Sequence, residues 1–247
     1  MTERRRDDAP TSPSESSPLP LAPLLVASLS RRRAMRGLAA ALPAAGLARG
    51  RTSAQGEAVV GVAGPDLVGV EFVGKIDQRG GEFTAYGFVA HVQGLDDGDL
   101  FATDLPEGRN ETAARLTFFG TASLTSRAVV DTLFVVTGEG SLRFYFNEPG
   151  GADFAVPESL FSGIQIAEAT IRIRSTVKVH APDRGLAEGT GSLAYATVEP
   201  FSLGGREVRL GEVGLVQAIG YTGQGALLDP DLPRSTIVLA GDLTTLG

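Results

Sequence analysis

Two histidines and four tyrosines are the side chains of this sequence best suited to acid–base or hydrogen-bonding chemistry. His91 continues an alternating, mostly apolar series, Phe83, Ala85, Gly87 and Val89, which would share one face of a strand. If that face lines the interior, the imidazole of His91 lies at the mouth of an apolar cavity and can serve as a general acid or base. The alternative is a core histidine satisfied by a single hydrogen bond.

Three tyrosines lie in segments that we predict to be strands, namely Tyr86, Tyr145 and Tyr195. Their hydroxyl groups can donate hydrogen bonds to a ligand, although tyrosine is equally common as an amphipathic strand residue. Together with His91, they are the candidate ligand-binding residues. His180 ends a predicted strand on its polar face, so we interpret it as a solvated residue.

The sequence contains no motif for a metal, a cofactor or a catalytic nucleophile. It has no cysteine, and neither an H-E-x-x-H nor a G-x-S-x-G motif occurs. Its glycine-rich turns lead into predicted strands and not into helices, which does not suit a phosphate-binding loop. The acidic run Asp96-Asp97-Gly98-Asp99 lacks the further ligands of a calcium loop, and we interpret it as a turn. We therefore expect neither a metal nor a cofactor, and we assign no catalytic residue.

Strands would position the candidate residues. In the clearest run, 171–180, Ile171 and Ile173 fall on one face and Arg172 and Arg174 on the other, as in a half-exposed strand. Similar runs bounded by turn residues lie at 67–76, 82–92, 113–124, 128–136, 141–147, 192–198, 206–218 and 235–240. We predict turns at 78–81, 94–98, 137–140 and 183–185, and a single helical turn at 157–162.

These elements predict an all-β fold. Short strands joined by short turns favour a single antiparallel β-barrel of about 8–10 strands, calycin-like or similar, over residues 55–247. A closed barrel leaves no strand edge exposed; a two-sheet sandwich is the alternative. A transmembrane barrel is disfavoured because only 6% of the residues are aromatic, too few for two interfacial girdles.

The first 54 residues have the character of an export sequence. Residues 2–20 are polar and rich in proline, a composition typical of disorder. The motif Ser30-Arg31-Arg32, with Met35 and Arg36 after it, resembles the bacterial twin-arginine export signal. An apolar run and the small residues of a cleavage site follow this motif, in the order that a secretory signal requires.

The apolar run, residues 37–48, is too short and too mildly apolar to anchor the chain in a bilayer. We therefore expect cleavage, no integral membrane span afterwards, and export to the periplasm, the cell envelope or the medium. Translation from Met35 instead of Met1 would leave a general secretory signal, so export is expected from either start.

The charge of the chain is unevenly distributed. The first 54 residues contain nine arginines and four acidic residues, whereas the remainder contains 13 basic and 25 acidic residues. Phosphates would repel so acidic a body, and we expect no nucleic-acid partner. The basic stripe of Arg172, Arg174 and Lys178 is interpreted as a solvated strand face; an acidic partner or a second copy of the chain, giving a homo-oligomer, is the alternative.

Three functional hypotheses follow. The first is an exported soluble barrel that binds a small, mostly apolar ligand in its interior. The second is a cofactor-free isomerase or cyclase that uses the same cavity, and it predicts an ionisable side chain with a shifted pKa facing that cavity. The third is a cell-envelope interaction protein whose barrel is solid. Whether the protein is an enzyme is left undecided by the sequence.

Overall fold

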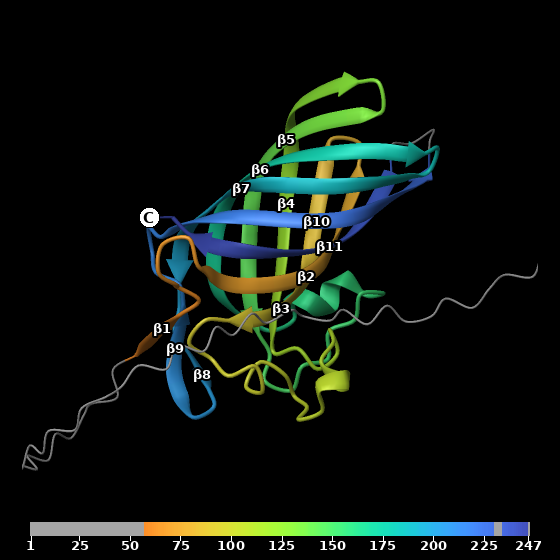
Figure 1. Ribbon diagram of the computed structural model, residues 1–247. Helices are drawn as coiled ribbons and strands as arrows, with labels where there is room; N and C mark the ends of the chain where they lie inside the picture. Colours follow the sequence, from red (N-terminus) through yellow and green to blue (C-terminus); the bar gives the residue numbers. More distant parts are fainter. Residues whose placement is uncertain (1–56, 230–233, 247) are drawn as a thin grey trace, which may run out of the picture. The chain divides into compact units, whose positions relative to one another are not determined.

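The computed structural model describes residues 57–229 and 234–246, and this part of the chain is nearly all β. Eight strands form one closed barrel in which every neighbouring pair is antiparallel, and no α-helix occurs in the described residues (Figure 1). The predicted all-β barrel is therefore confirmed, and the sandwich is not the architecture. The predicted disordered segment and export signal lie outside the described residues.

The barrel strands follow one another around the wall almost in chain order. Their order is β10-β11-β2-β3-β4-β5-β6-β7, and β10 closes the barrel by pairing with β7. The strands are β2 (Val68–Arg79), β3 (Glu82–Val92), β4 (Leu116–Val130), β5 (Leu133–Phe146), β6 (Ile164–Ala181), β7 (Arg184–Val198), β10 (Val216–Asp229) and β11 (Arg234–Thr245).

A small three-stranded sheet packs at the barrel end opposite the hairpin turns (Figure 1). It consists of β1 (Ala58–Val60), β9 (Arg206–Leu210) and β8 (Phe201–Leu203), and β1 runs parallel to β9. Val208 and Leu210 of β9 belong to the same buried cluster as the interior residues Val70 and Val92, so this end of the barrel is filled with side chains. Two 3₁₀ turns, η1 (Pro106–Gly108) and η2 (Pro157–Phe161), complete the structure, and η2 confirms the predicted helical turn.

Three of the sequence-based assignments are wrong. The predicted turn at 137–140 lies inside β5, and the chain reverses instead at Asp131, which adopts a φ of 54° and lies within the predicted strand 128–136. Gly140 serves close packing: a Cβ there would overlap the backbone oxygen of Thr121 on β4. The predicted strand 206–218 is divided into β9 and β10 by Gly211 and Gly214, which both take positive φ.

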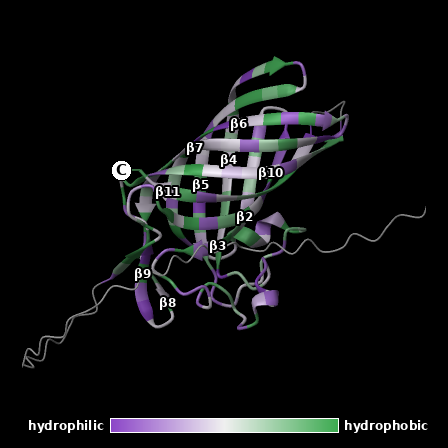
Figure 2. Ribbon diagram, in the orientation of Figure 1, coloured by the Kyte–Doolittle hydropathy of each residue, from purple (hydrophilic) through white to green (hydrophobic). Residues whose placement is uncertain are grey.

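Side chains alternate along each barrel strand between the interior and the outer surface, as Figure 2 shows by the alternation of apolar and polar residues. Cross-strand partners point to the same side, so the register identifies the interior set: Phe72 pairs with Val89, and Phe118 with Phe144. The inward residues form a core in the half of the barrel next to the small sheet. The other half, toward the hairpin turns, contains the cavity described below.

Candidate functional site

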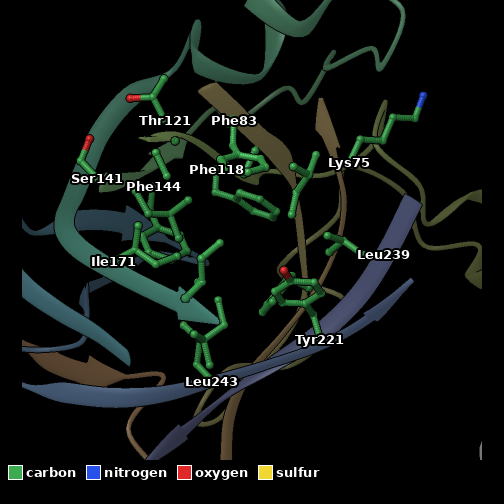
Figure 3. Close-up of a pocket in the computed structure, with 18 residues that line it drawn as sticks. Lys75, Phe83, Phe118, Thr121, Ser141, Phe144, Ile171, Tyr221, Leu239 and Leu243 are labelled. Carbon is green, nitrogen blue, oxygen red and sulfur yellow. The ribbon is translucent and has the colours of Figure 1, made fainter. Parts of the chain in front are cut away.

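The interior of the barrel contains an apolar chamber at mid-height. Its volume is about 60 Å³, room for a few water-sized groups. Figure 3 shows that Phe83, Phe118, Phe144, Ile171 and Leu239 surround this chamber together with Tyr221 and Leu243. The wall of the chamber is therefore built almost entirely from hydrocarbon.

The chamber continues into a wide mouth at the end that carries the hairpin turns. The mouth has a volume of about 700 Å³, within the range of small-molecule pockets. Four residues line both spaces and form the throat between them: Ile76, Phe83, Ile173 and Tyr221. Chamber, throat and mouth thus make one funnel that opens among the hairpin turns.

Inward glycines make room for the aromatic rings of the chamber. Gly74 and Gly87 face each other on β2 and β3, and a Cβ on either would approach the ring of Phe118 to 2.8 or 2.6 Å. Real side chains do not tolerate such contacts, so the ring can lie flat against this part of the wall only because both residues are glycine. The rings of Phe118 and Phe72 then meet edge to face, with centroids 5.6 Å apart.

A hydrogen-bonded pair of hydroxyl groups, Ser175 and Tyr221, provides the polar contact of the throat. Ser175 lies on β6 and Tyr221 on β10, and both pair with Gly189 of the intervening strand β7. The Tyr221 ring crosses directly over Gly189, where a Cβ would overlap the ring. Burial raises the pKa of Tyr221, while its hydrogen bond with Ser175 acts in the opposite direction. At neutral pH the phenol is therefore protonated and can donate a hydrogen bond.

His91 lies outside the barrel wall. A β-bulge at Ala90 brings Phe72 opposite Val89 and Glu71 opposite His91. The extra residue reverses the alternation, so His91 shares the outer face with Glu71 instead of the inner face with Val89. Its Nδ1 donates a hydrogen bond to Oδ1 of Asp97 over 2.8 Å, and 35% of the side chain is exposed.

Of the three predicted tyrosines, only Tyr195 points into the barrel. It lies at the filled end, where its hydroxyl donates to Oε1 of Gln217 over 3.1 Å, and burial raises its pKa. Gln217, itself fully buried, donates to the backbone oxygen of Gly61 over 2.9 Å. These hydrogen bonds satisfy the Tyr195 hydroxyl and the Gln217 amide at the filled end. Tyr195 does not line the chamber.

Tyr86 and Tyr145 are buried on the outer side of the wall. The hydroxyl of Tyr86 donates to Oδ2 of Asp77 over 2.8 Å, and burial, with this bond, raises its pKa. Tyr145 packs near Phe161 of η2, with ring centroids 6.4 Å apart. None of the four candidate residues lines the chamber or the mouth, and the structure brings no two of them together there. Their roles in ligand binding stay predictions.

The polar residues of the cavity that the sequence did not predict are Tyr221 and Ser175. Tyr221 is the fourth tyrosine and stands in a run rich in glycine, Gly220 to Gly225. An aromatic residue among alternating glycines is a usable signal, because such glycines accommodate a ring from the next strand. The partner could not have been found in this way, since Ser175 lies 46 positions away and across β7.

Among residues 57–229 and 234–246, no group of three or more histidine, cysteine, aspartate or glutamate residues is placed to hold a metal ion. In the acidic run 96–99, Asp97 is bound by His91, and Asp99 lies 3.7 Å from Arg206. These contacts, and the turn conformation of the run, agree with its interpretation as an acidic turn. Within the described residues, no helix has the length and apolar character needed to cross a membrane.

Comparison of the chain with protein-family models, with curated proteins and with solved structures finds no match. The shape and the lining of the cavity are therefore the features that point to a function.

Proposed function

We propose that this protein binds a small, mostly apolar molecule inside its barrel. The observation that carries the proposal is the continuous funnel, in which an apolar chamber of about 60 Å³ lies below a mouth of about 700 Å³. Apolar surface that enters such a chamber gains roughly 25 cal/mol for each Å² removed from water. Both the lining and the dimensions are those of a site for a small molecule.

The hydroxyl pair at the throat supports a ligand with one polar group along its length. Tyr221 and Ser175 satisfy each other, and each oxygen can accept or donate one further hydrogen bond. A hydroxyl or carbonyl group of the ligand at the height of the throat would form this further hydrogen bond. Because the Tyr221 phenol is protonated at neutral pH, it suits hydrogen-bond donation better than the proton abstraction an isomerase would require. We therefore favour binding over the enzymatic hypothesis.

The hollow interior also argues against the third hypothesis, a solid barrel. That hypothesis assigns function to the outer stripe of Arg172, Arg174 and Lys178. In the structure Arg172 lies 3.4 Å from Glu139 of the neighbouring strand, and both side chains are largely exposed. Such a pair is typical of an ordinary solvated face.

We infer from the arginine motif and the apolar run of the first 54 residues that the protein acts outside the cytoplasm. A mature chain recovered from outside the cytoplasm, with its first residue near Gln55, is the expected result. Retention of the full chain in the cytoplasm would contradict this inference.

Blocking the throat tests the binding function. Ile173 lines both the chamber and the mouth, so the larger ring in Ile173→Trp would fill the throat and project into the open mouth. We expect the wild-type protein to bind the neutral apolar dye N-phenyl-1-naphthylamine saturably, with a rise in dye fluorescence, and Ile173→Trp to bind it at least about tenfold more weakly.

The matched control is Thr170→Trp, which places the same ring on the exposed outer face of the same strand. It should bind the dye as the wild type does. The chain contains no tryptophan, so in each variant the new indole reports directly on whether its surroundings are apolar. No saturable binding by the wild type, or equal binding by Ile173→Trp, would remove the proposal.

A further inference from the structure

The funnel changes character along its length. The chamber is apolar, whereas the rim of the mouth carries charged side chains from two hairpins, β4–β5 and β6–β7. These rim residues are Arg127, Asp131, Asp183 and Arg184. The gradient from hydrocarbon to charge matches a ligand that is itself apolar at one end and charged at the other.

Arg127 is directed into the mouth by a β-bulge. In β4, Leu124 pairs with Gly138 and Ser126 with Thr137, so Thr125 is an extra residue on its strand. The bulge reverses the alternation beyond it and brings Arg127 opposite Val136, which lines the mouth.

Side-chain hydrogen bonds hold this bulge in place. The hydroxyls of Thr125 and Ser126 lie 2.9 and 2.6 Å from the Thr137 hydroxyl oxygen on β5. A strand without the bulge would direct Arg127 to the outside, where Arg172 and Arg174 of β6 lie. The orientation of Arg127 is therefore a specific feature of this wall.

The guanidinium of Arg127 is positioned but not neutralised. It lies over the ring of Phe134, 5.0 Å from the ring centroid. Several other arginines of the described residues have a carboxylate partner: Arg143 lies 3.0 Å from Glu168, for example, and Arg184 of the same rim lies 3.9 Å from Asp183. No ion pair within the described residues includes Arg127. A stacked guanidinium keeps its N–H edge free, and that edge matches the two oxygens of a carboxylate.

We propose that the cavity binds an elongated amphipathic carboxylate, with its head group on Arg127 and its apolar chain running down the funnel. This inference rests on the proposed binding function and specifies its ligand. Ala122 of the chamber and Arg127 of the rim pair with Gly140 and Val136, which are four residues apart on the unbulged strand β5 and so separated by roughly 13 Å of strand. A ligand that reaches both is a long chain and not a compact ring. The carboxylates of Asp131 and Asp183 repel the head group from their own positions on the rim.

A matched pair of ligands separates the head-group contact from the apolar contact. Dodecanoate and dodecan-1-ol share the same chain and differ in charge, and both compete with N-phenyl-1-naphthylamine for the cavity. We expect the wild type to bind the carboxylate about three- to tenfold more tightly than the alcohol at low ionic strength, with the preference declining as salt is added.

The protein variants assign that preference to one side chain. Arg127→Gln should bind the two ligands equally, with the affinity for the alcohol unchanged, and Arg127→Lys should keep part of the preference because it retains the charge but not the fork of donors. Arg172→Gln, which removes an outward arginine from β6, is the control and should behave as the wild type.

The outcomes distinguish the two proposals. Equal binding of carboxylate and alcohol by the wild type, or an unchanged preference in Arg127→Gln, overturns the head-group site while the apolar cavity stands. If neither the dye nor the alcohol binds the wild type, the proposed binding function fails, and the head-group site fails with it.

Discussion

Replacement of Phe118 by alanine is expected to lower the free energy of unfolding by about 3–5 kcal/mol. The side chain is only 5% exposed and lines the chamber. Its ring packs edge to face against Phe72 at 5.6 Å and lies 6.5 Å from Phe144. Gly74 and Gly87 have no side chains that could move into the space, so the truncation leaves an unfilled cavity and the full loss of stability that such a cavity causes. Urea unfolding followed by circular dichroism measures the change.

The same substitution should enlarge the ligand site. In Phe118→Ala the lost volume joins the chamber, so apolar ligands wider than those the wild type accepts should bind and restore part of the stability by mass action. Leu193→Ala is the matched comparison, because Leu193 is fully buried but does not line the chamber. It should lose about 2–5 kcal/mol without rescue by such ligands. Equal rescue of both variants would show that the ligands do not enter the chamber.

Replacement of Gly189 by alanine is expected to destabilise the protein by about 1–3 kcal/mol, although it adds only one methyl group. A Cβ at this position would overlap the ring of Tyr221, so the ring must leave the wall and its hydrogen bond with Ser175 is lost. The measurement is again the free energy of unfolding, with the affinity for the neutral dye as a second readout.

Two controls assign that effect to the ring. Gly220→Ala changes a glycine of β10 whose added Cβ would meet only Asp242, at 3.8 Å, and its stability should stay within about 0.5 kcal/mol of the wild type. In a Tyr221→Ala background the clash is absent, so Gly189→Ala should cost much less than it does alone. Additive effects of the two substitutions would contradict the proposed packing.

The hollow interior arises from a balance between glycines and large residues on the inward face. Gly87 and Gly189 each accept a ring from elsewhere in the wall, Phe118 and Tyr221 respectively. Each ring lies along the wall and not across the lumen, so the centre of the barrel stays open between the filled end and the hairpin turns. The same arrangement places Tyr221 at the throat between mouth and chamber.

The fold was predictable because its signal is local. Alternation with a period of two identified the inner and outer faces of most strands, and turn residues such as Gly80 and Gly81 identified the hairpin between β2 and β3. The failures have a local cause as well. Glycine in a turn and glycine in a tightly packed strand look alike in a sequence, so the interior Gly138 and Gly140 of β5 were assigned to a turn.

The site depended on features that no local pattern contains. One bulge, at Ala90, moved His91 to the outer surface, and another, at Thr125, turned Arg127 into the mouth. The period of a strand is two residues, so one inserted residue moves every later side chain of that strand to the opposite face of the sheet. The contact between Tyr221 and Ser175 likewise exists only because the closed sheet sets β6 and β10 on either side of β7. The sequence alone was sufficient for a barrel with an apolar interior, because each strand carries its own alternation; which polar groups face that interior was decided by pairing between distant strands.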